Sequence, residues 1–312
     1  MAAGAMDAAA GAAAGTATAI EDLPADVLAL VLRRLDGASL ATVGCACSGL
    51  RDLAADPGTW RGLCLAVWPS VRDVPLCAGG GHRALFADAF PFPAAPVPAA
   101  APRPLPARLI SAVDLHHGGV CILSRVVETD AASDWFLGSP FRVDALVQEG
   151  FSAPSAFAPA DLALSWILVD PATGRALNAS SRRPVSVDRK WLTGDTVARF
   201  AVALGGGVAL EAAVVCDERY GHVREVSLCA EDGDGGGVSG RDALAAVAAA
   251  MAGARRGSRG AEGEARLRYE EFVRGKRARK EWKARREGML DLCCSGVGAA
   301  AFLGFLVMLT LR

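Results

Sequence analysis

The chain has 312 residues, of which 52% are hydrophobic and 21% are charged, so most of it is expected to fold. A formal net charge of −1 excludes the strongly basic class of general nucleic-acid binders. The nine cysteines are scattered without a regular spacing, which argues against a disulfide-rich secreted scaffold and favours a reducing, cytosolic compartment.

The first 19 residues form a low-complexity segment. They are rich in alanine and contain no Lys or Arg, so they lack the basic segment with which a signal peptide begins. We therefore expect a disordered tail over residues 1–19.

Residues 20–67 are predicted to form a small helical module. After Leu23-Pro24, apolar residues recur at the spacing of one helical face, at Val27, Leu28, Val31, Leu32 and Leu35. The Gly after Asp36 ends this helix, Ser39 can cap a second one, and a third ends before Pro57. Three helices of this length bury little apolar surface, so the module would gain stability from a partner.

A stretch rich in Pro and Ala follows this module. Seven prolines lie between residues 91 and 106, and each fixes its own φ and removes a hydrogen-bond donor. We expect residues 68–106 to form a semi-stiff linker without helices or strands.

Residues 107–253 are predicted to form a mostly antiparallel, β-sandwich-like domain. Short apolar runs, several of them alternating with polar residues, are separated by turn residues. The expected strands are 109–115, 120–128, 141–147, 162–170, 185–188, 197–204, 210–216 and 223–230. A helix over about 240–252 is expected to close the domain. The predicted fold class of the whole chain is therefore α+β.

The C-terminal region changes from strongly basic to apolar. Between Arg255 and Arg286 there are 13 Lys or Arg residues against five Glu, which predicts a solvated basic helix over residues 254–288. The stretch Leu292–Leu311 then has 20 residues without charge, the length that crosses the hydrocarbon core of a bilayer. We therefore predict a single transmembrane helix over residues 290–311. A buried helix of the β-rich domain is the alternative.

The charge distribution predicts the orientation of this helix. Because the basic residues precede the apolar stretch and only Arg312 follows it, the N-terminal body is placed in the cytosol. This topology is that of a single-pass, tail-anchored membrane protein. Cys293 and Cys294 lie at the expected cytosolic boundary, where they are either lipidated or ordinary apolar residues.

One part of the helical module resembles an F-box. It opens with Leu-Pro-Ala-Asp at residues 23–26, continues through Leu-Asp-Gly at 35–37 and closes with Asp-Pro-Gly-Thr-Trp-Arg at 56–61. The resemblance implies a three-helix module that docks on a Skp-type adaptor, and through it on a cullin–RING ubiquitin ligase. The residues that it assigns to the adaptor contact are Leu23, Pro24, Val27, Leu28, Val31, Leu32, Leu40, Val43, Cys47, Leu53 and Trp60. The stretch 48–50 departs from the family, because many F-boxes have an aromatic residue there.

Nearly all of the chain after Ile20 resembles a group of plant F-box proteins that have a β-rich middle domain and a hydrophobic C-terminal tail. The blocks that carry this resemblance are Leu-Ile-Ser-Ala-Val-Asp (109–114), Ser-Trp-Ile-Leu-Val-Asp-Pro (165–171) and Ser-Ser-Arg-Arg-Pro-Val-Ser-Val (180–187). The resemblance leaves the target protein of the middle domain unknown.

The sequence contains no motif for a catalytic nucleophile, a nucleotide phosphate or a metal ion, so no catalytic residue, cofactor or metal is assigned. The tryptophans of the β-rich domain, Trp135, Trp166 and Trp191, are expected mostly in its core. Arg182 and Arg183 lie in a loop between apolar runs. This loop is the first candidate for binding an acidic or phosphorylated target.

The residues support three functional hypotheses. The first is a non-catalytic F-box adaptor that brings a target to a cullin-type ubiquitin ligase at the cytosolic face of a membrane. The second is a membrane-tethered, lectin-like or lipid-facing binding module whose F-box is not used to ubiquitinate a target. The third, a hydrolase or transferase, lacks a catalytic constellation.

Overall fold

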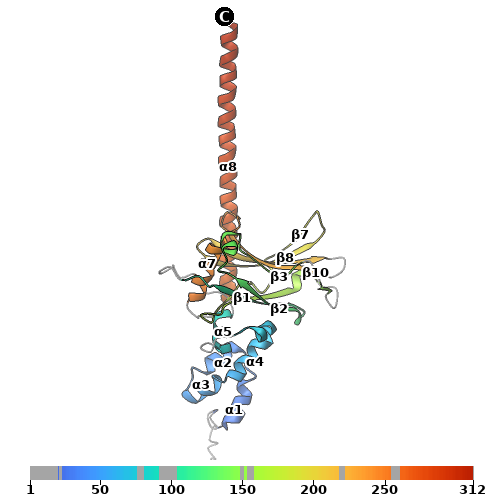
Figure 1. Ribbon diagram of the computed structural model, residues 1–312, viewed down its shortest axis with the longest axis vertical. Helices are drawn as coiled ribbons and strands as arrows, with labels where there is room; N and C mark the ends of the chain where they lie inside the picture. The colour runs from blue at the N-terminus through green and yellow to red at the C-terminus, as the bar shows by residue number, and fades with distance from the viewer. Residues whose placement is uncertain are drawn as a thin grey trace, which may run out of the picture. The chain divides into compact units, whose positions relative to one another are not determined.

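A computed structural model describes the chain at residues 20, 23–75, 81–90, 104–147, 151–152, 158–217, 222–253 and 261–311. The chain divides into two compact units, Met1–Thr59 and Trp60–Arg312. Figure 1 shows the helices of the N-terminal region, the strands of the middle region and the long C-terminal helix. The tail predicted over residues 1–19 and the central part of the predicted linker, residues 91–103, lie outside the described residues.

The first unit contains short helices: α1 spans Ala25–Leu32, α2 spans Gly37–Val43 and α3 spans Ser48–Ala54. Of these, α2 and α3 begin at capping side chains. The Asp36 carboxylate accepts the backbone N–H of Ser39 at 2.9 Å, so Asp36 caps α2 in the place predicted for Ser39. The Cys47 sulfur accepts the N–H of Leu50 at 3.5 Å and caps α3.

A fourth helix follows these three, where the sequence had predicted only three in the module. The Asp56 carboxylate accepts the N–H and the hydroxyl of Thr59, at 2.8 and 2.6 Å. These hydrogen bonds hold the pKa of Asp56 below its usual value and allow a new helix to begin at Pro57. This helix, α4, spans Pro57–Val67 and continues from the first unit into the second.

The second unit begins with a helical segment where a linker was predicted. After α4 come the 3₁₀ helix η2, Pro69–Asp73, and helix α5, Gly81–Ala89. Phe86 of α5 packs against Trp60 and Trp68, with ring centroids 5.5 Å apart in both pairs. The linker predicted over residues 68–106 is therefore wrong for its first part, because these aromatic side chains bury enough apolar surface to order it.

Two buried carboxylates fasten this helical segment to the strands. Asp114 has no exposed surface and accepts the N–H and the hydroxyl of Ser70, at 2.9 and 2.6 Å, and the hydroxyl of Ser124 at 2.7 Å. Burial raises the pKa of Asp114 above its usual value, although these hydrogen bonds act in the opposite direction. Asp88 of α5 forms an ion pair with Arg175 at 2.9 Å.

The strands form two antiparallel sheets, with the orders β2-β1-β5-β6 and β3-β10-β9-β8-β7, and β4 pairs with β10. Their bounds are Arg108–His117 (β1), Val120–Asp130 (β2), Arg142–Leu146 (β3), Phe151–Ser152 (β4), Leu162–Asp170 (β5), Arg175–Asn178 (β6), Ser186–Arg189 (β7), Thr196–Gly205 (β8), Val208–Asp217 (β9) and His222–Asp232 (β10). Each of the eight predicted strands overlaps one of these. The two strands that were not predicted, β4 and β6, are short, with 2 and 4 residues.

The two sheets share one apolar core. Fully buried side chains of both sheets, such as Leu164 and Phe200, belong to the same cluster. Helix α7, Gly240–Ala252, was predicted and adds Leu244 and Val247 to this core, whereas α6, Asp134–Gly138, and the 3₁₀ helix η3, Pro159–Asp161, were not predicted. The α+β class predicted from the sequence is confirmed.

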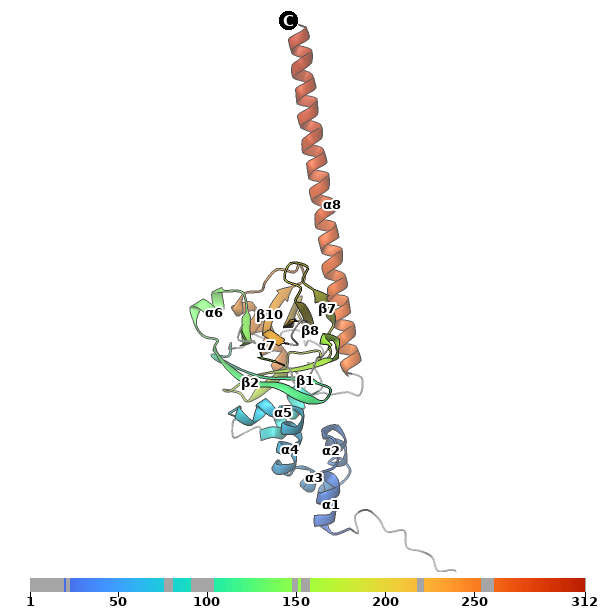
Figure 2. The same ribbon diagram turned by 90° about the vertical axis from the view of Figure 1, so that its right-hand side faces the viewer.

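Helix α8 spans Ala261–Thr310 without a break, where two separate helices were predicted. Its first turns lie beside the second sheet, where Tyr269, Phe272 and Val273 are half-buried. Lys276 forms an ion pair with Glu231 at 2.6 Å, and Arg279 forms one with Asp234 at 3.1 Å. Figure 2 shows the helix running beside the sheets and then extending beyond them.

The hydrogen bonds of Asp114 lead to a prediction about stability. Asp114→Ala leaves the N–H of Ser70 without its buried acceptor, and an unsatisfied buried donor costs about 1–3 kcal/mol. We expect the melting temperature of the full chain in non-ionic detergent, followed by tryptophan fluorescence, to fall by about 5–10 °C. Asp161→Ala removes an exposed carboxylate and should shift it by less than about 2 °C. Equal shifts for the two variants would contradict the role of Asp114.

Candidate functional site

A row of apolar side chains lies exposed along α1. Val27, Leu30 and Val31 follow the i, i+3 and i+4 spacing of one helical face, and Leu23 precedes them just before the helix; the four are called the α1 row below. Leu30 is 62% exposed and Val31 is 48% exposed, although large aliphatic side chains are usually buried. Because the other side of α1 buries Leu28 and Leu32, the helix carries apolar residues on both its core face and its solvent face.

The residues assigned to the adaptor contact from the sequence fall into three groups. Leu23, Pro24, Val27 and Val31 are exposed; Val43, Cys47 and Leu53 are half-buried; and Leu28, Leu32, Leu40 and Trp60 are buried. Side chains of the last group belong to the cores of the two units, with Trp60 in the second unit. The exposed Leu30 was missed by the sequence analysis, although its position three residues after Val27 indicates the same helical face.

The second candidate is the loop that contains Arg182 and Arg183. Hydrogen bonds to β5 and within the loop hold its backbone in place. Arg182 has a φ of 60°, a left-handed conformation that residues other than glycine rarely adopt. Its carbonyl oxygen accepts the N–H of Leu164 at 3.0 Å, and the hydroxyl of Ser180 donates to the carbonyl of Leu164 at 2.7 Å. The hydroxyl of Ser181 donates to the carbonyl of Arg183 at 2.6 Å. Both arginines are therefore exposed on a loop whose backbone is held by hydrogen bonds.

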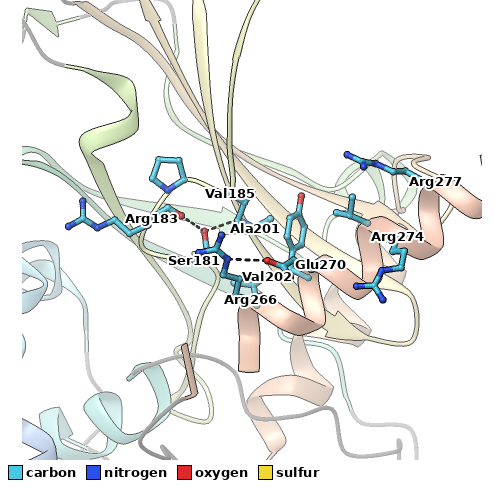
Figure 3. A pocket seen from close by; sticks show the side chains of 12 residues that line it. Ser181, Arg183, Val185, Ala201, Val202, Arg266, Glu270, Arg274 and Arg277 are labelled. Carbon is cyan, nitrogen blue, oxygen red and sulfur yellow. Dashed lines mark hydrogen bonds and ion pairs between the residues drawn. The ribbon is translucent and has the colours of Figure 1, made fainter. Parts of the chain in front are cut away.

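Arg183, but not Arg182, lines a cavity of about 450 Å³ between this loop, β8 and α8. Figure 3 shows Arg183 and Val185 on one side of the cavity and Arg266, Arg274 and Arg277 on the side of α8. The loop and the helix are more than 80 residues apart in the chain. The sequence alone therefore gave no signal that would group these arginines.

Two of the three tryptophans expected mostly in the core are exposed. Trp166 is fully buried, as predicted, but Trp191 is 87% exposed and Trp135 is 78% exposed. Trp191 and its exposed neighbour Leu192 lie in the turn between β7 and β8, where the N–H of Gly194 donates to the carbonyl of Lys190 at 2.8 Å. A turn of this kind has no second layer to cover it, so the rule that tryptophan is usually buried fails here.

The structure adds little chemistry beyond these arginines and apolar surfaces. Among the described residues, no group of three or more His, Cys, Asp or Glu side chains is placed to hold a metal ion. Asp114, in a strand that also holds His116, is instead occupied by the hydrogen bonds of Ser70 and Ser124. Burial lowers the pKa of His116 below its usual value.

Within the described part of the chain, α8 is the one helix that is long and apolar enough to cross a membrane. Its most apolar stretch is not buried against any part of the protein. Phe302, Leu303 and Phe305 are among the large apolar side chains that it exposes. This exposure argues against the alternative of a buried helix of the β-rich domain, since a core helix would cover these side chains.

Comparisons with known proteins point to the same N-terminal segment. An F-box-like family model matches residues 20–66. Probable F-box protein At2g36090 of Arabidopsis thaliana is 40% identical over 285 residues, which cover 88% of this chain and 87% of the relative. F-box protein At3g44326, from the same plant, is 36% identical and covers 94% of this chain and 91% of its own length. F-box protein At2g27310, also from that plant, is 37% identical, with 91% and 94% covered. No solved structure matches the chain significantly.

The division of the N-terminal leucines into exposed and buried groups leads to a prediction. Leu40→Ala removes a fully buried side chain and should lower the free energy of unfolding of the first unit by about 2–5 kcal/mol. Leu30→Ala makes the same chemical change at an exposed helical position and should change it by less than about 0.5 kcal/mol. Hydrogen–deuterium exchange of the full chain should therefore show faster exchange across α1–α3 for Leu40→Ala alone. Equal exchange in both variants would show that Leu40 is not part of the core.

Proposed function

The chain belongs to the family of plant F-box proteins, and we propose that it is the substrate-recruiting subunit of a Skp–cullin–F-box ubiquitin ligase at the cytosolic face of a membrane. In this role the protein is a non-catalytic adaptor. Its N-terminal helices bind a Skp-type adaptor, its β-sandwich binds the target protein, and α8 anchors the chain.

The observation that carries this proposal is the α1 row, because it lies inside the segment that matches the F-box-like family model. Complete burial of an aliphatic side chain contributes about 1.5–3 kcal/mol. The four side chains of the α1 row are each roughly half exposed, so covering them contributes about 4 kcal/mol in total. A helical unit this small gains substantially from a partner that covers the row. We therefore assign the contact with the Skp-type adaptor to this face. The half-buried Val43, Cys47 and Leu53 are assigned to the same contact.

The second unit is assigned to target recognition. Exposed aromatic and aliphatic side chains are the residues on which protein interfaces concentrate their binding energy, and Trp191 with Leu192 forms such a pair in the turn between β7 and β8. The exposed Arg182 and Arg183 add a basic loop that suits an acidic or phosphorylated region of a target.

The C-terminal part of α8 is assigned to a membrane anchor. Support comes from its 20 uncharged residues, Leu292–Leu311, and from their exposure. The preceding basic residues favour the cytosolic side for the rest of the chain. The anchor would confine the adaptor to targets near one membrane surface.

The adaptor contact is tested by charge substitution in the α1 row. Val31→Asp places a carboxylate in the proposed interface and should weaken capture of a purified Skp-type adaptor by the full chain in non-ionic detergent at least tenfold. Val187→Asp is the matched control, because Val187 is 41% exposed, close to the 48% of Val31, and lies in β7. This control should bind the adaptor as the unchanged chain does. Failure of the unchanged chain to bind would remove the ligase from the proposal.

The anchor is tested by placing a cation at the middle of the apolar stretch. An Arg at the centre of a spanning helix costs about 2.5–3.5 kcal/mol on insertion scales. We therefore expect Leu303→Arg to reduce post-translational insertion of the full chain into microsomes, measured as resistance to carbonate extraction. Met289→Arg, which precedes the apolar stretch, should insert normally. Extraction of the unchanged chain by carbonate would refute the anchor.

A further inference from the structure

The cavity beside Arg183 contains an excess of positive charge, and of its arginines only Arg183 belongs to the loop proposed for target binding. Its described lining residues include four arginines, Arg183, Arg266, Arg274 and Arg277, and one carboxylate, Glu270. Glu270 is already paired with Arg266 at 3.1 Å. Arg183, Arg274 and Arg277 form no ion pair with any residue that the structure describes. Three of the four arginines that line this cavity therefore have no ion-pair partner among the described residues.

The arginines that line this space are exposed and come from two elements. Arg183 comes from the loop before β7, and the other three come from α8 (Figure 3). Between them lie apolar side chains, among which are Val185 and Val202. An apolar wall reduces the local dielectric, so an anion held there interacts with the guanidinium groups more strongly than it would in water.

We propose that this cavity binds a small molecule that carries two or more phosphate groups. A guanidinium group presents a planar fork of donors that matches two phosphate oxygens, and such pairs are among the strongest hydrogen bonds in proteins. The arrangement on two sides favours a ligand with more than one phosphate group. The volume of about 450 Å³ is in the range of small-molecule pockets, which is about 300–1,000 Å³.

We assign a soluble molecule to this cavity rather than the headgroup of a membrane lipid. This assignment rests on the proposed membrane anchor. Arg277 is the lining arginine nearest to the apolar stretch, and it precedes Leu292 by 15 residues, or about 22 Å of helix. The headgroup layer extends only about 5–8 Å beyond the hydrocarbon core on each side. A phospholipid in the same bilayer therefore does not reach the cavity. A soluble ligand that contacts both Arg183 and Arg274 would also hold α8 against the β-sandwich.

The test uses inositol 1,4,5-trisphosphate as a probe and the full chain in phosphatidylcholine nanodiscs. Isothermal titration calorimetry should show one binding site, with an affinity that falls as salt is raised. The double variant Arg183→Ala/Arg274→Ala should bind at least tenfold more weakly. The matched control Arg241→Ala/Arg285→Ala removes the same charge from two exposed positions, one in α7 and one in α8, but neither residue lines the cavity. It should bind within about twofold of the unchanged chain.

A charge-preserving variant separates binding from folding. Arg183→Lys/Arg274→Lys keeps both cations and should retain more of the affinity than the alanine pair, with an unchanged melting temperature. No binding of the probe to the unchanged chain would overturn the proposal. So would an equal loss of affinity in the alanine pair and in its matched control.

A second experiment distinguishes a soluble inositol phosphate from the similar phosphorylated group carried by a membrane lipid. Nanodiscs that contain phosphatidylinositol 4,5-bisphosphate should leave the affinity of the chain for the soluble probe unchanged, because the lipid does not reach the cavity. Displacement of the probe by the lipid would overturn the assignment to the soluble phase. Repeating the titration in detergent, without a bilayer, tests the cavity alone, so its outcome is independent of whether α8 anchors the chain.

Discussion

The carboxylate of Asp114 has no exposed surface, and it accepts hydrogen bonds from Ser70, 44 residues earlier, and from Ser124 in the neighbouring strand. A carboxyl group so deeply buried is tolerated only when its oxygens accept hydrogen bonds, so the position of η2 is specified by β1 and β2. The aromatic packing of Phe86 on Trp60 and Trp68 depends on the same placement. The described residues 60–75 and 81–90 are thus part of the β-rich unit. The strands, in turn, present the arginine loop and the turn of Trp191.

Elements with a regular pattern of apolar residues were predicted correctly from the sequence, whereas a segment with only a few scattered aromatic residues was not. All eight predicted strands are present, because alternation and turn residues are local signals that the fold did not override. The segment around Trp68 and Phe86 was predicted as linker, since a few aromatic residues among many alanines and prolines have no visible period. The continuous helix α8 was divided into two because the change from basic to apolar residues suggested a boundary. No helix-breaking proline marks one there.

The candidate sites show the same limit. The helical period of α1 predicted apolar contacts but did not separate the face that fills the core, with Leu28, from the face that remains exposed, with Leu30. That separation depends on where α2 and α3 pack, which is tertiary information. Likewise, Arg183 was found as a loop residue, but its grouping with Arg274 depends on the docking of α8 against the second sheet. Residues distant in the chain become a site only through such contacts.

The unbroken course of α8 has a geometric consequence for the proposed membrane-anchored ligase subunit. Arg279 is held at the sandwich by Asp234, and Leu292 begins the apolar stretch 13 residues later, a rise of about 20 Å in helical form. With the apolar end in a bilayer, this interval acts as a stiff spacer that sets how high the recognition domain stands above the surface. Each residue in it adds about 1.5 Å to that height. The number of residues in the interval, more than their identity, would then decide which lysines of a neighbouring membrane protein come within range of ubiquitin transfer.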